Sequence, residues 1–222
     1  MARPDQIRFR RSTLGEDVYE ALKGLVLEHS LSPGDRINID ALAREFAVSP
    51  TPIREALARL EADGLVRKRP LVGYTVSPLL TRAEFDAMFE MRSLLECTSA
   101  RWAAERADAA HREAVSAEAA TTVAPQEDDP DGWHAAFTAL DARFHDLVAE
   151  ASGNGLLRDG IDRLHAHLHL HRRYFPYAQA SATVEEHRRI AAAIQAADPD
   201  GAEAAMREHL ARARERHLAA FD

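Results

Sequence analysis

The stretch from residue 39 to residue 76 constrains the fold more than any other part of the chain. Apolar side chains recur at helical spacing over residues 39–46 and again over residues 53–60. Ser49 is expected to cap the second helix, because its hydroxyl can accept a free backbone N–H. Pro50 would take the first helical position, where a missing N–H costs nothing. The pattern therefore predicts two short helices joined by a tight turn.

A short basic hairpin is predicted directly after these helices. Residues 65–69 and 73–76 have the composition of two strands, and Arg67 and Lys68 place positive charge near the turn between them. Gly73 has no side chain, so the backbone there can approach a phosphate closely. Two helices followed by such a hairpin indicate a winged helix-turn-helix, whose second helix enters the major groove of DNA. The alternative is a surface helical hairpin with a solvated basic loop.

This part of the chain resembles the GntR family of bacterial transcription regulators. The resemblance covers Leu14 to Val76 and rests on the runs PGDRIN, LAREFAVSPTPIREALARLEADGLV and G-Y-x-V. It implies contacts with DNA by Ser49, Thr51, Arg54 and Gly73, and a phosphate contact by Arg36. Many members carry an arginine that helps to read a guanine where this chain has Pro50. The resemblance therefore implies base readout that depends on Thr51, Arg54 and the basic hairpin.

Charge is unevenly divided along the chain. Residues 1–78 hold 12 Lys and Arg against 11 Asp and Glu, whereas residues 79–222 hold 16 against 25. A local basic patch is enough to contact phosphates, and the acidic remainder would repel DNA. Since 222 residues suffice for two cores, we predict a DNA-binding domain over residues 1–78 and a second domain over residues 79–222.

The composition argues against a disulfide framework and against a membrane protein. Cys97 is the single cysteine and falls in an apolar helical run, which predicts a buried thiol. No apolar run approaches the length of a membrane-spanning helix, and the N-terminus lacks the core of a signal peptide. We expect a soluble cytoplasmic protein without a membrane partner.

Beyond Pro78, helical periodicity continues and strand signals are nearly absent. Helices are predicted over residues 81–107, 111–121, 132–151, 154–175, 183–197 and 199–220. An acidic loop bounded by helix breakers is predicted over residues 124–130. The expected fold class is therefore mostly α, with an N-terminal winged helix-turn-helix followed by an antiparallel all-helical bundle.

Ten of the eleven histidines fall in this second region. Asp141 and His145 are spaced i, i+4 on one helix face, and the apolar residues around them predict that this face is buried. His187 and His209 lie on two further predicted helices, where both can point inward. One carboxylate and three imidazoles suit a first-row divalent metal. Spacing alone leaves open the alternative of an Asp–His hydrogen bond beside unrelated core histidines.

The second region resembles the FCD domain, the ligand-sensing domain of the FadR-like, fatty-acid-responsive branch of the GntR family. The resemblance covers most of residues 80–220 and rests on EMRSLLE, LDARFH, EHRRI and MREHL. In metal-containing members, the equivalents of Asp141, His145, His187 and His209 bind a divalent ion. The resemblance thus implies zinc or nickel, with manganese as a third candidate. It also implies a pocket in which a small carboxylate completes the coordination of the metal.

Two side chains are candidates for contact with such an effector. Arg92 matches an arginine of the pocket and could bind a carboxylate through two parallel hydrogen bonds. Its alternative role is an internal ion pair with Glu96, at i+4. In the run His165-Ala-His167-Leu-His169-Leu-His171, His171 falls on the apolar stripe and His167 at its edge. A satisfied polar role at a pocket rim or dimer seam is the alternative for both histidines.

Different classes of function could use these residues. A helical bundle with Asp and His ligands could be a metal-dependent hydrolase fused to a DNA-binding module. A hydrolase needs a general base beside the metal-bound water, and none is evident at helical spacing from His187 or His209. A purely structural metal is the other alternative. We expect a homodimeric, non-enzymatic transcription regulator, a repressor, that binds a palindromic operator and responds to a small carboxylate.

Overall fold

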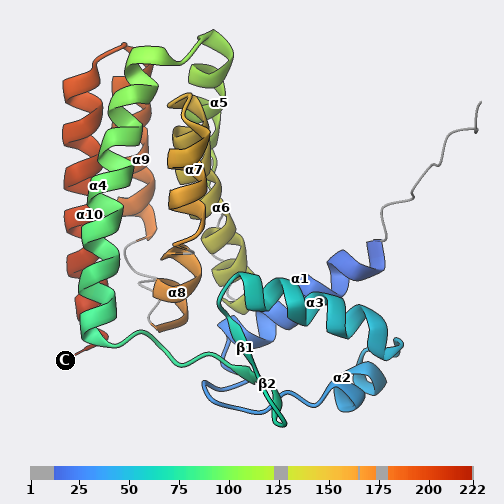
Figure 1. The fold of residues 1–222 in the computed structure, drawn as a ribbon. Coiled ribbons are helices and arrows are strands. Elements are labelled where there is room, and N and C mark those ends of the chain that lie inside the picture. Colours follow the sequence, from blue (N-terminus) through green and yellow to red (C-terminus); the bar gives the residue numbers. More distant parts are fainter. Residues whose placement is uncertain (1–12, 123–129, 165, 174–179, 222) are drawn as a thin grey trace, which may run out of the picture. The chain divides into compact units, whose positions relative to one another are not determined.

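The computed structural model describes residues 13–122, 130–164, 166–173 and 180–221. The chain divides into two compact units, residues 1–77 and residues 78–222 (Figure 1). The fold is mostly helical, as predicted, and the described strands both belong to the first unit. Within the described residues, no helix has the combination of length and apolar character that would let it cross a membrane.

The described part of the first unit is a winged helix-turn-helix. Its elements are α1 (Thr13–Leu27), α2 (Ile39–Glu45), α3 (Pro50–Ala62), β1 (Val66–Arg69) and β2 (Gly73–Val76). The strands pair antiparallel, with Val66 opposite Val76. The predicted apolar stripes are buried, including Leu42 of α2 and Ile53 and Leu60 of α3. Helix α1 packs against α3 and adds an element that the periodicity argument did not include.

The start of α3 corrects one detail of the prediction. Ser49 occupies the N-cap position, but its side chain makes no capping hydrogen bond. A capping hydroxyl accepts from the backbone N–H two or three residues into the helix, and Pro52, the third residue of α3, has no such group. The Ser49 hydroxyl therefore stays available at the exposed beginning of the helix.

The second unit is a helical bundle. Its described helices are α4 (Arg82–Arg106), α5 (Ala109–Ala120), α6 (Pro130–Ala151), α7 (Gly155–Asp162), α8 (Ala166–Arg173), α9 (Ala180–Gln195) and α10 (Pro199–Leu218). Helix α10 packs along α4 and α9, while α5 packs against α6 and α9. Local caps begin three of these helices, since Thr81 and Glu84 form a reciprocal capping box at α4 and Asn154 and Asp198 cap α7 and α10. The predicted loop over residues 124–130 lies outside the described residues except for Pro130, which is the first residue of α6.

The helix predicted over residues 154–175 is two helices, α7 and α8. At the end of α7 the hydrogen bonding tightens, because the Leu164 N–H donates to the carbonyl of Ile161, three residues back. No glycine or proline marks this break in the sequence. Helix α8 instead points two histidines at α6, where His167 meets Asp141 and His171 meets Thr138. Tertiary contacts therefore accompany the break, and residues 174–175 lie outside the described part of the chain.

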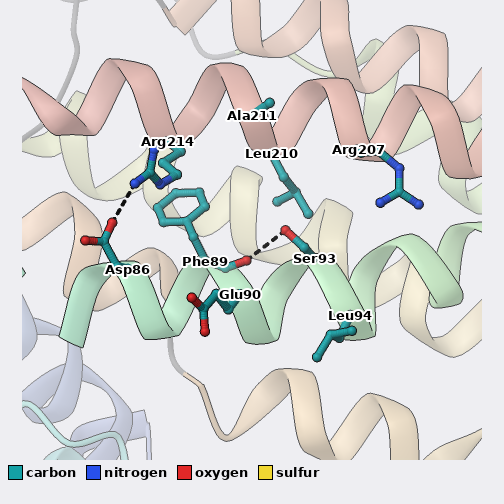
Figure 2. Close-up of a pocket in the computed structure, with 9 residues that line it drawn as sticks. All are labelled: Asp86, Phe89, Glu90, Ser93, Leu94, Arg207, Leu210, Ala211 and Arg214. Carbon is teal, nitrogen blue, oxygen red and sulfur yellow. Dashed lines mark hydrogen bonds and ion pairs between the residues drawn. The ribbon is translucent and has the colours of Figure 1, made fainter. Parts of the chain in front are cut away.

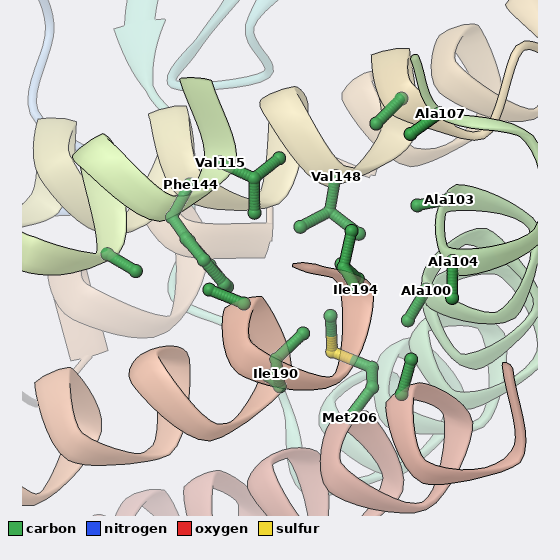
Figure 3. Close-up of a cluster of buried hydrophobic side chains, with 14 of the residues drawn as sticks. Ala100, Ala103, Ala104, Ala107, Val115, Phe144, Val148, Ile190, Ile194 and Met206 are labelled. Carbon is green, nitrogen blue, oxygen red and sulfur yellow. The ribbon is translucent and has the colours of Figure 1, made fainter. Parts of the chain in front are cut away.

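A buried apolar cluster holds the bundle together (Figure 3). Small side chains on α4 let the neighbouring helices approach closely; these are Ala100, Ala103 and Ala104. Larger side chains from α6, α9 and α10 fill the space between the helices; these include Phe144, Ile190, Ile194 and Met206. Cys97 is buried in this cluster, as predicted, and burial raises the pKa of its thiol to about 11. The ring of Phe144 stacks on His187 at a centroid distance of 3.9 Å, so the core directly borders the buried histidines.

Candidate metal centre and nucleic-acid interface

Three predicted metal ligands converge from three helices. His145 of α6, His187 of α9 and His209 of α10 each offer a ring nitrogen within 4.8 Å of the other two. The Nε2 atoms of His145 and His209 lie 3.2 Å apart. The three ring centroids are separated by 5.3, 5.2 and 4.9 Å, which is close to an equilateral arrangement. Three imidazoles that share one tetrahedral ion need such an arrangement.

Asp141, the fourth predicted ligand, lies beside these rings. Its Oδ1 atom is 3.3 Å from Nε2 of His187 and 4.0 Å from Nε2 of His145. Asp141 Oδ1 and His187 Nε2 are both buried and neither has a hydrogen-bond partner among the described residues. Buried polar atoms are ordinarily satisfied, and a divalent cation would satisfy both. Asp141, His145, His187 and His209, the four-ligand set, therefore fit a metal ion.

Two carboxylates orient the histidines from behind. Glu96 Oε2 is 2.5 Å from Nδ1 of His145, and Glu186 Oε2 is 2.8 Å from Nδ1 of His209. Metal-binding histidines commonly donate their second ring N–H to a carboxylate, which fixes the tautomer. Of these outer carboxylates, Glu96 and Glu186, Glu186 is hydrogen-bonded to Nδ1 of His209 and therefore leaves the Nε2 lone pair of that ring free for a metal, while Glu96 lies at the equivalent place behind His145. The sequence argument did not include them.

The electrostatics of the site favour the protonation states that a metal requires. Burial lowers the pKa of His145 to about 3 and that of His209 to about 4, so both imidazoles are neutral at pH 7. Burial by itself raises the pKa of Asp141, but interactions with His167 and other histidines outweigh it and hold the pKa well below its usual range. A neutral imidazole and an ionised carboxylate are the forms that coordinate metals.

Arg92 makes the ion pair that the sequence offered as its alternative role. Its Nε and Nη2 atoms donate to the two oxygens of Glu96 at 2.6 and 3.3 Å, and both side chains are buried. Arg216 holds Glu186 in the same two-bond manner, at 2.9 and 2.8 Å. These arginines therefore anchor the outer carboxylates, and Arg92, the arginine expected to bind an effector, is already engaged.

A small cavity borders the four-ligand set. Its volume is about 20 Å³, and it is lined by Arg92, Phe137, Asp141, Leu170, His171, Ala180, Thr183, His209, Ala213, Arg216 and His217. His171 is held there by Thr138, whose Oγ1 lies 2.8 Å from its Nδ1. Since this volume suits about one water molecule, an effector of several atoms needs a side chain or a helix to move.

His167 is also part of this site, although the sequence argument placed it only at the edge of an apolar stripe. Its Nδ1 atom lies 2.6 Å from Oδ2 of Asp141. Asp141, His145 and His167 form a second group with potential ligand atoms within 4.8 Å of one another. The i, i+4 spacing of His167 and His171 was the available signal. His165, in the same run, lies outside the described residues.

The outer face of α4 and α10 carries a groove of about 830 Å³ (Figure 2). It is lined by Asp86, Phe89, Glu90, Ser93, Leu94, Arg207, Leu210, Ala211 and Arg214. Arg214 of α10 is 2.6 Å from Asp86 of α4, so an ion pair links the two helices at one end. Leu94 is 67% exposed, which is unusual for a leucine on a long bundle helix.

In the first unit, three predicted DNA contacts surround one surface hollow. Arg36, Arg54 and Gly73 all line a depression of about 590 Å³. Gly73 has φ of +91°, and a Cβ atom there would meet nothing within 4 Å. Glycine is thus required by the left-handed backbone rather than by lack of space. The exposed arginine side chains of the hollow have no hydrogen-bonding or ionic partner among the described residues.

The other predicted contacts are exposed as well. Ser49 and Thr51 lie at the N-terminal end of α3, and Arg67 and Lys68 lie on β1. The ammonium of Lys68 sits 5.7 Å from the ring centre of Tyr74 on the paired strand. All seven predicted positions are therefore solvent-accessible. Ser49 and Thr51 lie at the N-terminal end of α3, and in this motif that end of the second helix enters the major groove.

Two family models match the chain. Residues 14–76 match the model of the bacterial regulatory proteins of the gntR family, and residues 87–212 match the FCD domain. The second match alone spans more than half of the chain.

Curated relatives and solved structures agree with these matches. The transcriptional repressor RspR of Escherichia coli is 27% identical, over 89% of this chain and 86% of its own. A putative L-lactate dehydrogenase operon regulatory protein of E. coli is 30% identical, with 89% and 83% coverage. The structure of E. coli McbR/YncC superposes with a TM-score of 0.71 at 20% identity, covering 95% of this chain and 99% of that one. This likeness shows the shared fold.

Proposed function

Because the chain belongs to the gntR family of bacterial regulatory proteins and carries an FCD domain, we propose that it is a metal-dependent, effector-responsive repressor. In this proposal a homodimer binds a palindromic operator through residues 1–78. A small carboxylate, bound beside a divalent metal in residues 79–222, causes the dimer to dissociate from the operator. That the chain is a DNA-binding transcription regulator follows from its family, which is one of regulators rather than enzymes.

The observation that carries the metal part of the proposal is the convergence of the four-ligand set. Three imidazoles and one carboxylate meet from α6, α9 and α10, and two of them are backed by the outer carboxylates. Zinc and nickel suit this mainly nitrogen donor set, with manganese as a third candidate. When bound, the ion would act as a Lewis acid that attracts an anionic ligand.

The effector part rests on the cavity and on chemistry at its walls. FCD domains bind small-molecule effectors. The cavity beside Asp141 has neutral donors in Thr183 and His171, in addition to the metal position itself. A carboxylate could therefore bridge the ion and these donors. RspR is named as a repressor, and another relative is named as a putative regulatory protein of an L-lactate dehydrogenase operon; L-lactate is a small carboxylate.

The homodimer part is supported by the α4–α10 groove. Acidic side chains line it from α4 and basic ones from α10, around the apolar Phe89, Leu94 and Leu210. A two-fold interface uses the same patch on both subunits, so the patch must complement itself. The exposed Leu94 and the opposite charges on the two sides of the groove, of which Asp86 and Arg214 already pair within one subunit, support such a patch. We assign this groove to the dimer interface.

The proposal can be tested on an operator selected from random DNA with the purified protein. Fluorescence anisotropy would then follow release of this operator by acetate, lactate and citrate. We expect at least one acid to release the metal-loaded wild type, and none to release the His187→Ala/His209→Ala variant. Equal release of both proteins would contradict a role for the metal. If metal removal unfolded the bundle and no acid acted on the wild type, the structural-metal alternative would be favoured.

A further inference from the structure

Asp141 directs its two oxygens at different partners. Oδ1 faces the rings of His187 and His145, whereas Oδ2 lies 2.6 Å from Nδ1 of His167 on α8. His171, one turn further along α8, has its Nε2 3.8 Å from the same Oδ2 atom. A fourth imidazole, outside the four-ligand set, is thus in contact with the ligand carboxylate.

The ring of His167 lies as close to His145 as the other two ligand rings do. Its centroid is 4.8 Å from that of His145, while the three converging rings are 4.9 to 5.3 Å apart. Its donor nitrogen is also within 4.8 Å of ligand atoms on both Asp141 and His145. A histidine that only oriented Asp141 would need to approach the carboxylate alone. His167 approaches two members of the four-ligand set together.

His167 also differs from the four-ligand set in its accessibility. Its side chain is 12% exposed, whereas those of His145, His187 and His209 are 2 to 5% exposed. It is carried by α8, a helix of only eight residues. His167 does not line the small cavity beside the site, but it is the most solvent-accessible of the imidazoles around Asp141, so a carboxylate that approaches the metal from the side of α8 would displace its ring.

We propose that His167 is an exchangeable fourth imidazole ligand of the metal, which occupies the position that an effector carboxylate takes over. A divalent ion and the Asp141 carboxylate together leave one positive charge in a buried site. Exchange of the neutral His167 imidazole for an effector carboxylate would cancel that charge. Burial favours the neutral combination. Release of His167 would remove one of the contacts that hold α8 against α6, and the contact between His171 and Thr138 would remain. This inference rests on the proposed metal centre but makes a separate prediction about the number of bound histidines.

The test uses full-length protein loaded with Co²⁺. In its proton NMR spectrum, each cobalt-bound imidazole contributes one strongly shifted, exchangeable N–H signal. We expect four such signals in the wild type and three in His167→Gln and His167→Asn, with cobalt content unchanged. His169→Gln, two residues along the same helix, is the matched control and should keep four. Acetate, used as the probe carboxylate, should remove from the wild type the same signal that His167→Gln lacks.

Three signals in cobalt-loaded wild type would overturn the inference and leave the proposed metal centre standing. Four signals in both His167 variants would also overturn it. Persistence of all four signals at saturating acetate would overturn the exchange. If the wild type bound no cobalt at all, by elemental analysis, the metal centre and this inference would both fail.

Discussion

The residues around a buried histidine set its protonation state and orientation, and so determine whether it can bind a metal. His145 and His209 are buried, and burial keeps both neutral near pH 7. Glu96 and Glu186 then select the tautomer that turns Nε2 inward. Each of these carboxylates is itself held by an arginine. The charge of every outer group is thus matched, which makes burial of the whole site energetically feasible.

The sequence predicted which residues would be the proposed ligands, but not the residues that support them. Asp141 and His145 share one helix face by spacing, and the family motifs added His187 and His209. Glu186 directly precedes His187 in the chain yet contacts His209 on α10. Only the packing of α9 against α10 brings these two residues together, and residue spacing along a single helix does not contain that information.

Arg54 is the predicted base-reading arginine of α3. Arg54 is exposed on α3 and has no partner among the described residues, so its replacement should leave the fold intact. We expect Arg54→Ala to weaken binding to the selected operator by about 1–3 kcal/mol, with an unchanged thermal unfolding midpoint. Arg163→Ala, an exposed arginine of the second unit, is the control. Wild-type operator affinity in Arg54→Ala would contradict the assigned recognition surface.

At the scale of elements, apolar periodicity predicted most of the helices, but the predicted Ser49 cap is absent and tertiary contacts could not be predicted. Thr81, Asn154 and Asp198 cap α4, α7 and α10, and such caps are local interactions. The break between α7 and α8 has no local signal and goes with contacts that His167 and His171 make to α6. The missing Ser49 cap follows from Pro52, a local effect that the position of Ser49 alone does not reveal.

The capping box of α4 is expected to stabilise the second unit. Thr81 accepts from the Glu84 N–H at 3.3 Å, while Glu84 accepts from the Thr81 N–H at 2.8 Å. We expect Thr81→Ala to reduce the free energy of unfolding of the second unit by about 1 kcal/mol, measured by urea denaturation. Thr122→Ala, at an exposed position beyond α5, should have no effect. Equal stability of the two variants would show that the cap is dispensable.

For the whole molecule, the proposed homodimer is the property that would connect effector binding to DNA binding. A palindromic operator requires two recognition helices related by symmetry. We expect Leu94→Glu, within the α4–α10 groove, to shift the dimer towards monomer in sedimentation equilibrium, because it replaces an exposed apolar side chain of the groove by a charged one. Leu156→Glu, at an 84% exposed leucine on α7 outside the groove, is the matched control. A Leu94→Glu dimer as stable as wild type would place the interface elsewhere.

Native mass spectrometry of the purified full-length protein tests the central claim most directly, because it reports subunit number and bound metal in one spectrum. The account predicts a wild-type dimer that carries one divalent ion per subunit. It also predicts a His187→Ala/His209→Ala dimer without metal, since two of the four converging ligands are lost. A wild type without metal, or a double variant with undiminished metal content, would contradict the account.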